Sequence, residues 1–178
     1  DGEREERYFL NMASAGLAGH VDRIVNRSSK RFGGRATFFL ATIQARASYG
    51  EAEVSIELDG TPLGSRTITN VMVANGPYAG GGMKLAPDAR LADGLLEVVI
   101  VRASSFIRSL KLVPKLYNGQ HVHDPLVEVY RGRQVQLSTA EDEPVLLDID
   151  GESPGKLPAQ FKVMPQAIRL LNVKPTFL

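Results

Sequence analysis

The middle of the chain alternates between apolar and polar residues. Val54, Ile56 and Leu58 are separated by polar side chains, which is typical of a strand with one buried face. Asp59 and Gly60 follow as a pair that favours a tight turn between two strands. Further short strand-like runs occupy residues 67–74, 95–102, 127–130, 135–137, 145–149, 160–164 and 167–173. Gly, Pro, Asn or Asp separates most of them, and this spacing favours an antiparallel β-sandwich over βαβ units.

A few segments show helical spacing instead. Apolar residues three and four positions apart predict helices over residues 16–26 and 35–47. A third helix is predicted over about residues 104–119, capped by serine at its start and by an Asn-Gly pair at its end. Pro114 lies inside this helix and should kink it or end it early. Because no repeat or long linker divides the sequence, we expect a single domain over residues 1–178, mainly β, with a few helices.

Composition narrows the possible functions. The 178 residues include 17 Gly and 10 Pro, too many for a helical bundle and suitable for a turn-rich β protein. Lys and Arg number 21 and Asp and Glu 20, so the net charge of +1 provides no general attraction for nucleic acid. The absence of cysteine excludes disulfides, thiol nucleophiles and Cys-ligated metals. No apolar run is long enough to cross a membrane.

The first segment with candidate chemistry is rich in glycine. Asn75 follows a predicted strand, and Gly80, Gly81 and Gly82 come shortly after it. Consecutive glycines adopt positive φ readily and can present backbone N–H groups to an anion, as phosphate-binding loops do. The spacing matches neither the P-loop nor the dinucleotide-binding fingerprint. A tight crossover between sheets is therefore the alternative interpretation.

The second such segment is a group of carboxylates after the predicted strand 145–149. Asp148 and Asp150 are two residues apart and so point to the same side of an extended strand, and Gly151 allows Glu152 to turn back toward them. Adjacent carboxylates repel one another unless a cation or basic group neutralises them, which suits Mg²⁺ binding or general-base chemistry. Because Asp-Gly is also a common turn pair, a solvated hairpin is the alternative.

Two other groups of residues point less clearly to a function. Positive charges are frequent over residues 23–35 and could meet phosphates or anionic lipid, but a solvated helix face explains them more simply. His121 and His123 lie two positions apart with no third metal ligand in view. We therefore interpret both histidines as loop residues.

The order of these motifs resembles the C-terminal half of the diacylglycerol kinase catalytic family, which includes sphingosine kinases and bacterial lipid kinases. The matching segments are residues 8–16, Asn75-Gly76, Gly80–Met83, Ala86-Pro87 with Ala89, residues 93–98 and Asp150-Gly151-Glu152. The resemblance implies a two-lobe kinase in which an N-terminal α/β lobe carries a Gly-Gly-Asp-Gly-Thr nucleotide loop and a C-terminal β-sandwich lobe completes the cleft. This sequence lacks that loop and does not begin with Met. We therefore expect the nucleotide lobe to lie upstream, and the chain alone to have no kinase activity.

The resemblance also implies roles for individual residues. Asp93 would hold a structural Mg²⁺ through its side chain, with the carbonyl groups of Arg90 and Leu95 as further oxygen ligands. Asp150 and Glu152 would face the cleft between the lobes. One of them would accept the proton of the lipid hydroxyl or bind the Mg²⁺ of the nucleotide, and Asp150 is the first candidate for the base.

The implied reaction is transfer of the γ-phosphate of ATP to a hydroxyl of diacylglycerol or a related lipid, assisted by Mg²⁺. Asn75 and Gly80–Gly82 would contact the nucleotide. The expected partners are the protein's own N-terminal kinase lobe and the lipid substrate, in the cytoplasm, with peripheral contact to the inner membrane face. Two other classes remain open: a non-catalytic β-sandwich that binds lipid or protein, and a hydrolase that uses Asp148, Asp150 and Glu152.

Overall fold

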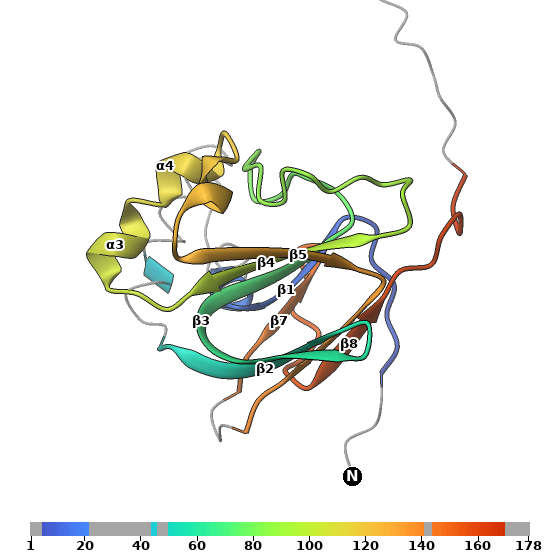
Figure 1. Cartoon of the computed structure of the whole chain (residues 1–178), viewed down its shortest axis with the longest axis horizontal. Coiled ribbons are helices and arrows are strands. Elements are labelled where there is room, and N and C mark those ends of the chain that lie inside the picture. Colours follow the sequence, from blue (N-terminus) through green and yellow to red (C-terminus); the bar gives the residue numbers. More distant parts are fainter. Residues whose placement is uncertain (1–4, 22–43, 46–49, 141–143, 170–178) are drawn as a thin grey trace, which may run out of the picture.

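The computed structural model describes residues 5–21, 44–45, 50–140 and 144–169, and it is mainly β, as predicted. Its strands are β1 (Met12–Gly16), β2 (Ala52–Leu58), β3 (Thr61–Ala74), β4 (Leu96–Arg102), β5 (Val127–Gly132), β6 (Gln134–Ser138), β7 (Leu147–Ile149) and β8 (Ala159–Lys162). Its named helices are α3 (Phe106–Leu110), α4 (Val113–Leu116) and the 3₁₀-helix η1 (Gln120–His123). The three helices lie together at one side of the strands (Figure 1). No helix in the described ranges is long and apolar enough to span a bilayer.

The strands form one antiparallel sheet in the order β5-β4-β3-β2-β6-β8, and β1 and β7 branch from β3. The long strand β3 belongs to both parts of this sheet. Its first half pairs with β2, and its second half lies between β1 and β4. A register shift between Ile68 and Asn70 marks the change, and β3 curves from one layer to the other (Figure 1). The sheet therefore forms the predicted sandwich.

The main core lies between the two layers. It contains buried side chains from both, including Ala13, Val54, Ile56, Val73, Val98, Val135, Leu137 and Phe161. A second, smaller core lies on the outer face of β3 and β4, where Met72 and Val99 pack against Ala86 and Ala89. Because β4 is covered on both faces, its sequence is a nearly continuous apolar run and does not alternate.

Most predicted strands coincide with observed ones within a few residues. The turn at Asp59 and Gly60 is confirmed, since both residues have positive φ and connect β2 to β3. The strand predicted over residues 67–74 begins earlier, at Thr61, because Pro62 and Gly64 obscure its apolar pattern. The strand predicted over residues 167–173 is wrong for residues 167–169, which have no regular structure. Residues 170–173 lie outside the described residues.

The helix predicted over residues 104–119 is two helices. Ser105 caps α3, since its hydroxyl accepts a hydrogen bond from Arg108 N at 3.4 Å. Pro114 lies in the first turn of α4, where a backbone N–H has no helical hydrogen bond to make. The proline therefore favours the start of a second helix at Val113. The prediction over residues 16–26 is confirmed for the described residues 17–21. The predicted helix over residues 35–47, apart from residues 44–45, and the basic residues 23–35 lie outside the described residues.

Candidate functional site

Asp150 ends β7 with its carboxylate held by the backbone that leads into β1. Its Oδ2 accepts a hydrogen bond from Leu10 N at 2.7 Å, and its Oδ1 accepts from Met12 N at 2.8 Å and from Asn11 N at 3.2 Å. Asp150 and Gly151 both have positive φ, at 49° and 89°, which reverses the chain directly after the strand. Three N–H donors therefore fix the Asp150 carboxylate in one orientation at this edge of the sheet.

The chain turns at Gly151 as predicted, but Glu152 turns back onto Ile149 and not onto the two Asp carboxylates. It exchanges two backbone hydrogen bonds with Ile149, at 2.8 and 3.0 Å. Its side chain is 78% exposed, and its Oε2 lies 3.5 Å from Nη1 of Arg7. Asp148 instead accepts a hydrogen bond from Ser14 Oγ at 3.4 Å. The three carboxylates therefore have separate partners, and no group of three metal-ligating side chains occurs among the residues the structure describes.

An open cleft of about 540 Å³ lies beside these carboxylates. We call it the carboxylate cleft, and it is lined by Glu5, Arg7, Tyr8, Ile149, Asp150 and Glu152. The lining combines one guanidinium with three carboxylates. A phosphate could meet Arg7 here, while a hydroxyl could donate its proton to Asp150 or Glu152.

The glycine loop (residues 75–83) forms a tight hairpin. Ala79 and Met83 exchange two backbone hydrogen bonds, at 3.0 and 2.9 Å. Between them, Gly80, Gly81 and Gly82 have φ values of 54°, 78° and 94°, which side chains rarely adopt. The turn explains why glycine occupies all three positions. Contact of these residues with a nucleotide stays a prediction.

The start of the glycine loop binds the same segment that donates to Asp150. Asn75 N and Gly76 N both donate to Asn11 O, at 2.8 and 3.0 Å, and Asn75 Nδ2 donates to Leu10 O at 2.7 Å. Asn11 Nδ2 in turn donates to Tyr78 O at 3.0 Å. Any side chain at position 76 would clash with Asn11, because its Cβ would overlap Asn11 Oδ1. The sequence indicated the glycine loop and the Asp150 turn separately. It did not indicate that residues 10–12 form hydrogen bonds with both.

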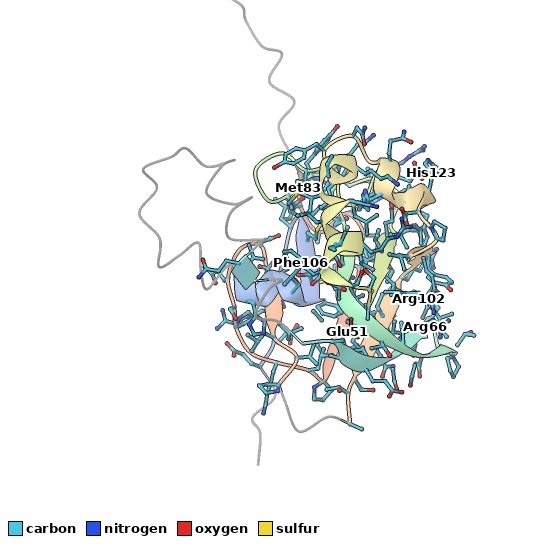
Figure 2. All side chains as sticks on the ribbon, turned by 90° about the vertical axis from the view of Figure 1, so that its left-hand side faces the viewer. Glu51, Arg66, Met83, Arg102, Phe106 and His123 are labelled. Carbon is cyan, nitrogen blue, oxygen red and sulfur yellow. The ribbon has the colours of Figure 1, made fainter. Side chains whose placement is uncertain are left out.

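A second candidate site is apolar, and sequence reasoning missed it. α3 and α4 cover a cavity of about 140 Å³, here called the α3 cavity. Its wall comes from the helical residues 17–21, β3, the glycine loop, β4, α3, α4, η1 and β5. Met72 and Met83 both line it, and Figure 2 shows Met83 on the side where the two helices lie. No local pattern indicates this cavity, because its lining residues are far apart in the sequence.

His121 belongs to this cavity wall, and its interpretation as a loop residue is wrong. It lies in η1, is completely buried, and has Nε2 3.0 Å from Leu85 O. Burial lowers the pKa of His121, so the neutral imidazole is favoured near pH 7. The prediction that His121 and His123 hold no metal is untested.

Comparison with known proteins assigns the chain to a family. The model of the YegS C-terminal NAD kinase beta sandwich-like domain matches residues 11–172, which is most of the sequence. The chain belongs to this family. Diacylglycerol kinases of Staphylococcus carnosus and Bacillus subtilis are each 28% identical to it over 173 residues. Each match covers 97% of this chain and 56% of the relative, so the chain spans about half the length of the relatives it matches.

A solved structure shares the fold. The crystal structure of a diacylglycerol kinase from Bacillus anthracis str. Sterne matches with a TM-score of 0.61 at 24% sequence identity. The match covers 88% of this chain and 50% of that one. The resemblance to the C-terminal half of diacylglycerol kinases is thereby confirmed, and so is the β-sandwich fold.

The family resemblance led us to expect Mg²⁺ at Asp93, but the carboxylate already has partners. Oδ1 accepts a hydrogen bond from Leu95 N at 3.0 Å, and Oδ2 forms an ion pair with Arg131 of β5. The carbonyl of Arg90 accepts a hydrogen bond from Asp93 N at 3.4 Å. These two contacts use about half of the lone-pair directions of the Asp93 carboxylate. Mg²⁺ binding at Asp93 stays a prediction.

Glu97 of β4 is a buried acid that sequence reasoning counted as part of an apolar strand. It is 1% exposed, and neither carboxylate oxygen has a hydrogen-bond partner within the described part of the chain. Burial raises the pKa of Glu97, and the nearby Asp88 carboxylate adds to the rise. The backbone N–H of Asp88 opposes the rise in pKa, and the charges of Arg131 and Lys84 add to this opposition. The charged form of Glu97 therefore destabilises the fold.

We expect Glu97→Gln to stabilise the protein at alkaline pH. Because the folded-state pKa is raised, the wild-type protein loses stability as the pH rises from the unfolded value of 4.5 through the folded value. The neutral amide avoids that loss, so the variant should gain about 1–3 kcal/mol near pH 8. Thermal melts of both proteins between pH 4 and pH 8 measure the difference. A difference that does not grow with pH contradicts this explanation.

Asp124 forms ion pairs with both α3 and α4, the two helices that cover the α3 cavity. Its carboxylate is almost completely buried, with Oδ1 2.7 Å from Arg108 Nη2 on α3 and Oδ2 2.9 Å from Lys115 Nζ on α4. Leu126 N also donates to Oδ1, at 3.2 Å. The hydrogen bond from Lys115 is the largest cause that lowers the pKa of Asp124. Asp124 therefore links α3 to α4 as an ionised group.

We expect Asp124→Asn to lower the melting temperature at pH 7 and to matter less in acid. A depressed folded-state pKa adds stability above the unfolded pKa of 3.8, and this stability is lost as the pH falls through the folded value. The loss at pH 7 should be about 1–3 kcal/mol, because the neutral amide keeps one acceptor oxygen and places an NH₂ donor against one of the two cations, Arg108 or Lys115. Denaturant unfolding at pH 7 and pH 3 measures it. An equal difference at both pH values would show that the carboxylate charge is irrelevant.

Proposed function

We propose that this chain is the lipid-binding lobe of a two-lobe kinase that transfers the γ-phosphate of ATP to a hydroxyl of diacylglycerol or a related lipid. The observation that carries the proposal is that two segments, residues 10–18 and the glycine loop, connect the carboxylate cleft to the α3 cavity. Residues 10–12 donate hydrogen bonds to Asp150, which lines the carboxylate cleft, and β1 leads from them to residues 17–18, which line the α3 cavity. The glycine loop contacts Asn11 at one end and lines the cavity through Met83 at the other.

These positions suit an elongated amphipathic substrate. The strand β1 (Met12–Gly16), which connects the two sites, spans on the order of 13 Å, since an extended strand rises about 3.3 Å per residue. A cavity of about 140 Å³ accommodates an apolar group of roughly the size of benzene. One segment of a lipid chain would occupy it while the hydroxyl end reaches the carboxylate cleft.

A hydrolase acting through three clustered carboxylates finds less support, because those side chains have separate partners.

In the proposed reaction, Asp150 orients the lipid hydroxyl and accepts its proton. A carboxylate offers about four lone-pair directions, and the N–H groups of residues 10–12 use three of them. These donors hold the Asp150 carboxylate in one orientation and leave about one lone pair for the hydroxyl of the lipid. Phosphoryl transfer has a loose transition state in which positioning matters most, so a well-oriented acceptor suits it. Glu152 is the second candidate for the base.

The remaining residues act on the phosphate side. ATP would enter with its own Mg²⁺, bound mainly by the other lobe, which neutralises charge on the phosphates. Arg7 could offset further negative charge in the carboxylate cleft, because its guanidinium already lies beside Glu152. Asn75 and Gly80–Gly82 stay candidates for contact with the nucleotide. Asn75 contributes indirectly as well, because its amide group positions Leu10.

The proposal is tested with labelled ATP and a panel of hydroxyl lipids. A protein that joins this chain to its nucleotide lobe should phosphorylate at least one lipid, and the 178-residue chain alone should phosphorylate none. Diacylglycerol, a sphingoid base and phosphatidylglycerol cover the main headgroup classes. Failure of the two-lobe protein with every lipid, while it still binds ATP, would favour a non-catalytic binding module.

A further inference from the structure

The short helix α3 exposes three large apolar side chains. Phe106, Ile107 and Leu110 are 38%, 70% and 38% exposed, and no residue of α3 is buried. Single exposed apolar residues are common, but three on five consecutive residues form a patch that indicates an interaction surface. Figure 2 shows Phe106 on the face of the molecule where α3 and α4 lie.

The surroundings of this patch are basic. Residues 98–123 contain four Lys or Arg residues and no Asp or Glu: Arg102, Arg108, Lys111 and Lys115. The next acid, Asp124, is buried and already pairs with two of them. Arg102 has the partly exposed Glu128 3.9 Å away. The chain as a whole carries a net charge of only +1, so this positive region is local. An apolar patch within a basic region complements the surface of an anionic bilayer.

The patch is continuous with the α3 cavity. Phe106 and Leu110 line the cavity and are also exposed, so the same side chains form its wall and the outer surface. The cavity holds only a short apolar segment. The rest of a long lipid chain needs another apolar environment, which a bilayer against α3 provides.

We propose that α3 docks on an anionic membrane surface, with Phe106, Ile107 and Leu110 inserted among the lipids, so that the α3 cavity receives a lipid chain directly from the bilayer. The inference rests on the proposed function, because it assumes a lipid substrate. Arg108, Lys111 and Lys115 would lie at the level of the headgroups. The two helices would thus serve as both the wall of the cavity and the contact with the membrane.

The test uses the 178-residue chain and vesicles made either of phosphatidylglycerol and phosphatidylcholine in equal parts or of phosphatidylcholine alone. We expect co-sedimentation with the anionic vesicles and much weaker binding to the neutral ones. Ile107→Glu should reduce binding by about tenfold or more, since it removes one inserted apolar side chain and adds a repelled charge. Lys111→Glu should reduce binding to anionic vesicles only. Ile168→Glu is the matched control, because Ile168 is 61% exposed and belongs to the segment after β8. That segment, drawn in red, lies on the opposite side of the molecule from α3 (Figure 1).

A fluorescence measurement provides an independent readout. The chain contains no Trp, so a single Trp reports on one position. I107W emission should shift to shorter wavelength with anionic vesicles, whereas I168W emission should not shift. Unchanged I107W emission, or wild-type vesicle binding by Ile107→Glu, would overturn the proposal.

Two further outcomes are distinguished. If the wild-type chain is a dimer and Ile107→Glu is a monomer that binds vesicles as before, the patch is an interface between copies and the proposal fails. Ile107 does not line the α3 cavity, so binding of a soluble short-chain diacylglycerol tests the proposed function separately. Binding of that lipid without vesicle binding would refute docking and leave the proposed function standing.

Discussion

In the two-lobe kinase, Asp150→Asn is expected to lower kcat by about 10²–10⁴-fold, the usual contribution of a positioned acid or base. The substitution removes the oxygen pair that three N–H groups hold in place and leaves one amide oxygen as acceptor. The hydroxyl of the lipid would then lack its proton acceptor. The Michaelis constant for ATP should change little, because in the proposed enzyme the other lobe would hold most of the nucleotide. Steady-state kinetics with labelled ATP measure both constants.

Two further variants show whether the loss of kcat is specific to Asp150. Glu57→Gln removes a carboxylate that lies on β2, outside the carboxylate cleft, and should leave kcat unchanged. Glu152→Gln tests the second candidate for the base. If Asp150→Asn retains near wild-type turnover while Glu152→Gln loses it, Glu152 is the proton acceptor. Asp150 then only holds residues 10–12 in position through their hydrogen bonds.

Filling the α3 cavity is expected to abolish lipid phosphorylation with little change in stability. Ala18 lines the cavity, and Phe at this position adds a ring of about the size that a cavity of about 140 Å³ can hold. The lipid chain would be displaced, so kcat/KM for a long-chain lipid should fall by at least about tenfold, as when a buried apolar contact is lost. Activity assays with the series Ala18→Val, Ala18→Leu and Ala18→Phe should show a graded loss.

The melting temperature indicates whether the new ring occupies empty space. Overpacking a filled core costs about 1–3 kcal/mol, whereas a ring in a vacant cavity adds apolar contact without that cost. We therefore expect Ala18→Phe to melt at or above the wild-type temperature. A variant that is destabilised yet fully active on long-chain lipid would refute the assignment of this cavity to the substrate.

Local sequence patterns predicted the features that depend on neighbours in the chain. The alternation at Val54, Ile56 and Leu58 follows from one buried face, and the Asp59-Gly60 turn follows from backbone preferences. The turn of Glu152 back toward the strand was likewise predictable, because Gly151 accepts positive φ at little cost. By contrast, β1 has the sequence Met-Ala-Ser-Ala-Gly, which lacks the branched residues of a typical strand. Its position between two other strands determines its structure.

The features that were missed depend on contacts between distant segments. The carboxylate of Asp93 forms an ion pair with Arg131, 38 positions away. Asp150 meets residues about 140 positions away. The α3 cavity combines residues from segments that lie far apart between Leu17 and Val127. Only the folded arrangement brings these groups together.

Methyl NMR tests most directly whether the α3 cavity is the site of the lipid chain. The chain has four methionines, and two of them, Met72 and Met83, line the cavity. Met164 is 57% exposed and does not line it, so it serves as an internal control. Titration of the ¹³C-methyl-labelled chain with a soluble short-chain diacylglycerol should shift the Met72 and Met83 signals saturably and leave Met164 unchanged. Unchanged Met72 and Met83 signals at a lipid concentration that saturates the active two-lobe kinase would contradict the account.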